Sequence, residues 1–191
     1  MNIRRPRLLV IGHARHGKDT VCEALVDRLG YTYTSSSWFA AEKFIFENME
    51  GYSSIQECWD DRVNHRALWH DMIRHYNFPV LSRFASELYS EYDIYCGLRN
   101  REEYYAILKD CRPDHVIWVD ACNRLPREGK DSFQLDYMDA SYYFDNNGTL
   151  DDFDVEFGMM VKTLALDKWI ECTEPTPSDD LHTDDIVQTT P

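Results

Sequence analysis

The sequence lacks two features that would place it at a membrane or on nucleic acid. No apolar run approaches the roughly 20 residues that a membrane-spanning helix needs, so we expect no membrane partner. Basic residues are scarce: 20 Lys and Arg stand against 34 Asp and Glu, a formal net charge of −14. That charge opposes sequence-independent binding to nucleic acid or anionic lipid, but it is compatible with a small basic pocket for a phosphate.

Metal-binding and export signals are also missing. The six cysteines form no CxxC pair, and none has a histidine at zinc-finger spacing, so we expect no structural metal site. The basic start of the chain runs into an apolar stretch that is too short for a signal peptide. These absences predict a cytoplasmic protein with reduced thiols.

Strand and helix patterns alternate along the chain. Of the 191 residues, 43% are hydrophobic, which is enough for the core of one domain. We expect strands at 7–11, 31–34, 93–98, 115–119 and 142–144, and helices at 18–30, 38–50, 54–76, 79–92, 101–111 and 149–166. This alternation predicts an α/β domain over residues 1–170 with a parallel sheet between helices. Residues 171–191 contain six acids and no Lys or Arg, which predicts a disordered acidic tail.

One motif carries strong chemical information. A GxxxxGK pattern lies between an expected strand and an expected helix. Glycines let backbone N–H groups curl around a polyphosphate, the helix N-terminus adds positive potential, and the lysine reaches the β- and γ-phosphates. We therefore expect ATP to bind at Gly12, His13, Ala14, Arg15, His16, Gly17, Lys18, Asp19 and Thr20.

The motif departs from its usual form at one position. Asp19 stands where a Ser or Thr hydroxyl normally binds Mg²⁺, and Thr20 follows it. No aspartate ends the expected strand at 93–98. The acid that holds Mg²⁺ is therefore open between Asp19, Asp93 and Asp120.

The G-K-D-T form of this loop resembles that of bacteriophage deoxynucleoside monophosphate kinases, within the group of thymidylate and adenylate kinases. Residues 93–103, 115–121 and 145–149 also resemble sections of that group, so the likeness covers most of residues 7–166. It implies a P-loop three-layer sandwich with a parallel sheet, a helical substrate-binding insertion at 35–92, and a short arginine-bearing lid at 120–139. We call residues 120–139 the lid segment.

The resemblance also implies an activity and site residues. It implies ATP- and Mg²⁺-dependent transfer of a phosphoryl group to a deoxynucleoside monophosphate, in phage nucleotide metabolism in the cytoplasm of an infected cell. Arg99, after a strand end, is expected to grip the acceptor phosphate, with Lys18 and Arg124 as further catalytic residues and Arg127 on ATP. Further acceptor contacts are expected from Ser36, Ser37, Arg62 and Arg66, of which the two arginines, four residues apart, would share a helix face. A surface role for each arginine stays open.

Two other functions are compatible with the sequence. The same machinery serves a DNA-modification kinase that phosphorylates the hydroxyl of 5-hydroxymethyluracil in DNA, for which Asp60, Asp61 or Asp93 would supply the base. A non-catalytic nucleotide-binding module is the third hypothesis. An enclosed surface around Arg99 would favour a free nucleotide, and an open basic channel would favour DNA.

Overall fold

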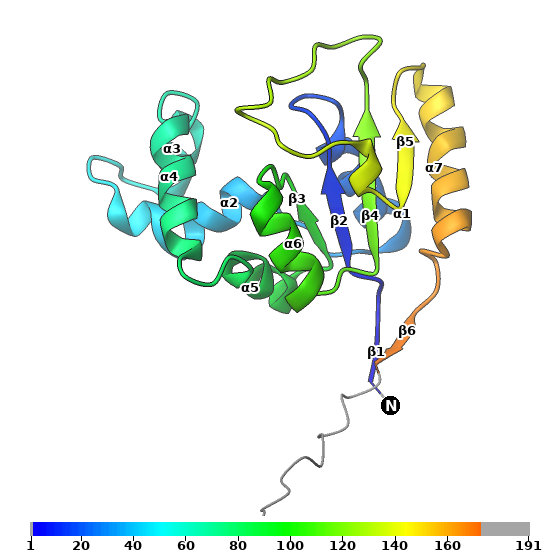
Figure 1. Ribbon diagram of the computed structural model, residues 1–191, viewed down its shortest axis with the longest axis horizontal. Coiled ribbons are helices and arrows are strands. Elements are labelled where there is room, and N and C mark those ends of the chain that lie inside the picture. The colour runs from blue at the N-terminus through cyan, green and yellow to red at the C-terminus, as the bar shows by residue number, and fades with distance from the viewer. Residues whose placement is uncertain (1, 173–191) are drawn as a thin grey trace, which may run out of the picture.

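A computed structural model describes residues 2–172 of the chain (Figure 1). Its centre is a parallel sheet of four strands, in the order β3 (Ile94–Cys96), β2 (Leu8–Ile11), β4 (His115–Asp120) and β5 (Tyr142–Asp145). The strand expected at 31–34 is reduced to a single parallel bridge from Tyr33 to Ile94. The predicted α/β class with a parallel sheet is confirmed.

The sheet is buried on both faces along β2, β3 and most of β4, which explains why these strands are largely apolar runs. Along β2 successive side chains point to opposite faces, so Leu8 and Val10 join one core cluster while Leu9 and Ile11 join the other. The first face is covered by α1 (Lys18–Leu29) and α7 (Leu150–Leu164). The second face is covered by α2 (Ser36–Ala40), α5 (Arg83–Glu91) and α6 (Arg101–Asp110). Helices on both faces make the three layers that the sequence predicts.

The helices of the 35–92 region are shorter than expected. The helix expected at 38–50 is α2, followed by a π-helical turn (Ala41–Ile45) and a 3-10 turn (Phe46–Asn48). The single helix expected at 54–76 is wrong: α3 (Ile55–Asp61) and α4 (Arg66–Asn77) are separate. The break follows from side chains that compete with the helical backbone, because the Asp61 carboxylate accepts hydrogen bonds from Asn64 and Tyr52.

The ends of the described chain meet in a small sheet that the sequence pattern did not predict. Strand β1 (Asn2–Arg4) pairs antiparallel with β6 (Ile170–Cys172). The prediction of a disordered tail from residue 171 is therefore wrong for Glu171 and Cys172, and the rest of it, 173–191, lies outside the described residues. Within residues 2–172, no helix combines the length and the apolar character that crossing a membrane requires.

Candidate active site

The phosphate-loop motif forms the turn between β2 and α1. The backbone has positive φ at both motif glycines, 142° at Gly12 and 93° at Gly17. Space is also restricted there: a Cβ on Gly12 would lie 2.4 Å from the Val119 carbonyl oxygen, and one on Gly17 would lie 2.2 Å from Nδ2 of Asn146. Backbone conformation and close packing therefore both require glycine at these positions.

Lys18, the first residue of α1, supplies a positive charge beneath the loop. Its side chain is buried, and its Nζ donates a hydrogen bond of 2.7 Å to the carbonyl oxygen of His13. Burial lowers the pKa of Lys18, and the charge of Arg99 lowers it further, while the Asp19 and Glu128 charges raise it. Within the described part of the chain the His13 carbonyl is the one hydrogen-bond partner of the buried ammonium, which is therefore well suited to an incoming anion.

The buried side of the phosphate loop is anchored by His16. This side chain is fully buried; its Nδ1 accepts a 3.0 Å hydrogen bond from the Ala121 N–H, and its Nε2 lies 3.3 Å from the Pro126 carbonyl oxygen. The Asn146 amide donates to the His16 carbonyl at 2.9 Å. The side chain of His16, expected to contact ATP, thus fixes the loop to the end of β4 and to the lid segment, and its backbone carbonyl fixes the loop to Asn146 after β5.

Glu128 of the lid segment reaches into the loop, a contact that the sequence reasoning missed. One carboxylate oxygen, Oε2, accepts a 2.6 Å hydrogen bond from the Ala14 backbone N–H. The other, Oε1, lies 2.5 Å from Nη1 of Arg99. Burial tends to raise the pKa of Glu128, but the bonds from Arg99 and Ala14 and the charge of Lys18 lower it overall. The carboxylate is therefore ionised and sits among the positive groups of the loop.

Arg99 lies where the sequence predicts it, beyond the end of β3 and next to the phosphate loop. Its link through Glu128 to Ala14, and its effect on Lys18, place the guanidinium beside the motif. This placement follows from the topology, because β3 and β2 are parallel neighbours and their carboxyl ends share one edge. Its role on an acceptor stays a prediction.

Arg124 and Arg127 of the lid segment have partners outside the loop. Nε of Arg124 donates 3.0 Å to the Asn146 carbonyl, and Nε of Arg127 lies 3.0 Å from the Cys122 sulfur. Both side chains are exposed. Arg15, at the tip of the loop, is exposed with a φ of 65°. The structure brings none of these three arginines onto the loop amides.

Asp93 is a wrong prediction as a magnesium ligand. It precedes β3, and its carboxylate accepts hydrogen bonds from the backbone N–H and the hydroxyl of Thr32. Because β2 and β3 run parallel with Leu8 opposite Ile94, Asp93 lies at the amino edge of the sheet. The phosphate loop lies at the opposite, carboxyl edge, about 13 Å away along a four-residue strand. The Asp93 side chain is too short to reach the phosphate loop.

Two carboxylates remain at the correct edge. Asp19 Oδ1 accepts a 2.5 Å hydrogen bond from the Tyr33 hydroxyl, and burial raises the pKa of Tyr33, so the phenol stays protonated. Asp120 ends β4; burial tends to raise its pKa, but hydrogen bonds from Cys122, Asn147 and Tyr143 hold that pKa well below the usual range. Both side chains offer carboxylate oxygens, the kind of donor that Mg²⁺ prefers.

Asp120 also belongs to a mixed group with His16 and Cys122. One ligand atom from each of these residues lies within 4.8 Å of the other two. Both ring nitrogens of His16 already face backbone partners, however, and the Cys122 sulfur donates to Asp120 at 2.8 Å. Within residues 2–172, these contacts link the phosphate loop to the lid segment, which gives the group a structural role.

The residues expected to bind the acceptor form a polar and aromatic group on α2 and α3. Ser37 accepts a 3.1 Å hydrogen bond from the Trp59 indole N–H, and the guanidinium carbon of Arg62 lies 3.7 Å from the centre of the Trp59 ring. Burial lowers the pKa of Arg62, while the charges of Asp60 and Asp19 raise it. Ser36 lies against Gly97, where a Cβ would come within 3.0 Å of its hydroxyl.

Arg66 does not lie on the same helix as Arg62. The two were expected on one helix face, but Arg62 caps the end of α3 and Arg66 begins α4. Arg66 is exposed. The prediction that the two arginines share a helix face is therefore wrong, because the helix breaks between them.

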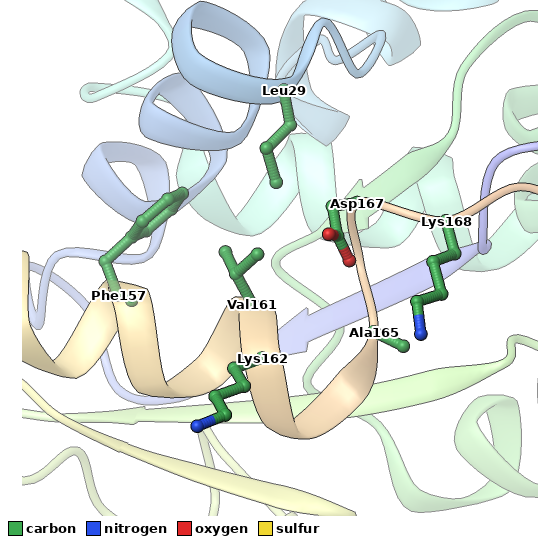
Figure 2. Close-up of a pocket in the computed structure, with 8 residues that line it drawn as sticks. Leu29, Phe157, Val161, Lys162, Ala165, Asp167 and Lys168 are labelled. Atoms are coloured by element: carbon green, nitrogen blue, oxygen red, sulfur yellow. The ribbon is translucent and has the colours of Figure 1, made fainter.

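A pocket of about 350 Å³ lies elsewhere, between the C-terminal ends of α1 and α7 (Figure 2). Figure 2 shows Leu29, Phe157 and Val161 on its apolar side, with Lys162 and Lys168 at its margin. Because α1 begins at the phosphate loop and Leu29 is its last residue, this pocket is at the far end of the helix. It contains none of the expected site residues.

Comparison with known proteins gives only distant structural neighbours. No family model matches the chain, and no curated protein matches it. A shikimate kinase from Bacteroides thetaiotaomicron is similar at 11% identity and a TM-score of 0.48, covering 85% of this chain and 99% of its own. A sugar kinase from Janibacter sp. HTCC2649 is similar at 12% identity and a TM-score of 0.45, covering 86% and 99%. Functional conclusions therefore depend on the chain's own residues.

Proposed function

We propose that this protein is a P-loop kinase that transfers the γ-phosphoryl group of ATP, with Mg²⁺, to a deoxynucleoside monophosphate. The observation that carries the proposal is the environment of the Glu128 carboxylate. One anionic group is held at once by a loop amide and by Arg99, within the field of Lys18. Catalysis of phosphoryl transfer consists mainly of positioning and charge neutralisation, and these are the groups that supply both.

The residues present fit ATP and Mg²⁺. The loop already accommodates an anion on the Ala14 N–H, so the triphosphate has a matching cradle, with Lys18 as its cation. Asp19 and Asp120 are the oxygen donors at this edge that would hold Mg²⁺, directly or through water. The bound ion would neutralise charge on the phosphates. Arg99 would orient the acceptor phosphate.

The acceptor side favours a free nucleotide with a planar base. Trp38 and Trp59 meet edge to face at 5.6 Å between ring centres, and Arg62 stacks on Trp59. Flat rings and a guanidinium suit a nucleobase and its phosphate. The Arg99 side chain is held by Glu128 of the lid segment and is 38% exposed, so the surface around it is partly open.

The DNA-modification alternative receives less support. It needs a carboxylate base at the acceptor, but Asp93 lies at the opposite edge of the sheet. Asp61 accepts hydrogen bonds from Tyr52 and Asn64, and Asp60 accepts one from Gln56. The three carboxylates considered for that role are therefore either distant or engaged.

A transfer screen with radiolabelled ATP tests the proposal. The acceptors are the four deoxynucleoside monophosphates, hydroxymethylated pyrimidine monophosphates, and plain and hydroxymethylated DNA, each with Mg²⁺. We expect label on a free monophosphate, and none with the Lys18→Ala variant. Label on hydroxymethylated DNA alone would replace the proposed acceptor. Binding of ATP without transfer to any acceptor would favour the non-catalytic module.

A further inference from the structure

Glu128 occupies the place that an anionic ligand would take. Its two carboxylate oxygens are divided between the phosphate loop, through the Ala14 N–H at 2.6 Å, and Arg99, at 2.5 Å. The Glu128 backbone N–H also donates to Nδ1 of His13 at 3.2 Å. A carboxylate has the charge and the planar pair of acceptor oxygens to satisfy the groups that otherwise receive a phosphate.

The segment that carries Glu128 has its buried residues at its two ends, and its middle contacts the loop through polar groups of Pro126 and Glu128. Ala121 is fully buried at one end, and Phe133 and Leu135 are each 4% exposed at the other. Between them, Arg127, Gly129, Lys130, Asp131 and Ser132 are exposed. Figure 1 shows this stretch as a long arch after β4, on the same side of the sheet as the loop after β2. A segment whose ends are buried and whose middle is exposed can move at its middle without disturbing the core.

We propose that Glu128 is a built-in competitor for the phosphate site, which an incoming polyphosphate must displace from both Ala14 and Arg99. Displacement does two things at once. It opens the loop amide to the donor phosphates, and it releases the guanidinium of Arg99 for the acceptor. One carboxylate thereby couples donor binding to the readiness of the acceptor site, and Arg99 stays neutralised until a donor is present.

This inference rests on the proposed function, because it assumes that the loop binds a nucleotide polyphosphate. Its consequence is a lowered apparent affinity: a ligand that binds only the open form is weakened by the fraction of protein that is open. If the Glu128 contacts keep roughly nine molecules in ten closed, removing them raises the affinity about tenfold.

The test is calorimetric titration of four proteins with a non-hydrolysable ATP analogue and Mg²⁺. These are the unchanged chain, Glu128→Ala, Glu128→Gln and the control Asp131→Asn. Asp131 is an exposed acid on the same arch, so its variant removes the same charge without touching the loop. We expect the Kd to fall about tenfold for Glu128→Ala. The Kd of Glu128→Gln should fall less, because its amide oxygen can still accept a hydrogen bond from the Ala14 N–H. The Kd of Asp131→Asn should stay within about twofold of that of the unchanged chain.

The outcomes separate the two proposals. If the unchanged chain binds the analogue and neither Glu128 variant binds it more tightly than Asp131→Asn does, the competitor role is wrong while the proposed function stands. If none of the four proteins binds it, the proposed function fails and the competitor role fails with it. A melting temperature for each variant, equal to that of the unchanged chain within a few degrees, confirms that the proteins compared are folded.

Discussion

The phosphate loop and the lid segment meet at Glu128, but they are held in different ways. The loop is fixed by two glycines with no room for a Cβ, by a fully buried His16, and by Asn146, which is hydrogen-bonded to its backbone. The middle of the lid segment is exposed, and its Glu128 contacts the loop amide through its carboxylate. When a ligand binds, the phosphate loop can therefore stay in place while the Glu128 carboxylate moves.

Under the two proposals, the loop would supply the specificity for anions and the lid segment would regulate access. The cradle supplies fixed backbone dipoles and a buried ammonium, which need no reorganisation when a phosphate arrives. The lid segment supplies charges that depend on side-chain position. Changes in the cradle should therefore abolish activity, while changes in the lid segment should alter affinity or stability by smaller amounts.

Lys18→Ala gives the largest expected effect. Removing the ammonium beneath the loop should lower kcat at least a thousandfold, about 4 kcal/mol in barrier, because its charge acts on the transferring phosphoryl group. Steady-state kinetics with the acceptor found in the screen measures this. Lys130→Ala, an exposed lysine of the lid segment, is the matched control and should leave kcat unchanged. Activity of Lys18→Ala within about tenfold of the unchanged chain would remove Lys18 from the mechanism.

Phe133→Ala tests the anchor of the lid segment. The Phe133 ring is buried, 4.9 Å from the ring centre of His13 and 5.7 Å from that of Trp118. Truncating it should cost about 3 kcal/mol of unfolding free energy through lost burial and a cavity. Urea unfolding measures the change. Met138→Ala, an exposed apolar residue of the same segment, should cost less than about 0.5 kcal/mol. Equal effects of the two variants would show that the lid segment has no buried anchor at Phe133.

Arg99→Ala separates the two acceptor hypotheses. With a free monophosphate acceptor, losing a charge-assisted contact should cost about 2–3 kcal/mol in kcat/KM, mainly as a higher KM for the acceptor. With a hydroxyl on DNA, binding should weaken modestly and its salt dependence should fall by about one phosphate contact. Arg74→Ala, on an exposed ion pair with Asp71, is the control. An unchanged acceptor KM and kcat would make Arg99 a surface residue.

Deleting residues 173–191 gives the smallest expected effect. The deleted stretch is rich in acids and prolines, so it offers little apolar surface to bury. Ending the chain at Cys172 keeps β6 and its pairing with β1. We expect a melting temperature within about 2 °C of the full chain and unchanged turnover. A drop of about 5 °C or more would show that these residues pack against the domain.

The sequence predicted those parts of the site that are determined by residues close together in the chain or by the direction of the strands. The loop between β2 and α1 follows from a short motif, and the position of Arg99 follows from strand direction. Two failures have physical causes. The turn after α3 depends on the side chains of Asp61 and Asn64 outcompeting a helical pattern, and β1–β6 joins residues at opposite ends of the domain. Glu128 was missed because an acid in a polar segment looks like surface until the fold brings it to Ala14.

The central claim, that a nucleotide displaces Glu128 from the phosphate loop, is tested most directly by a crystal structure with a non-hydrolysable ATP analogue and Mg²⁺. We predict β- or γ-phosphate oxygens within hydrogen-bond distance of the Ala14 N–H and Lys18 Nζ, and a Glu128 carboxylate that has left both Ala14 and Arg99. A nucleotide bound elsewhere, such as in the pocket of Figure 2, with Glu128 still on Ala14, would contradict the claim.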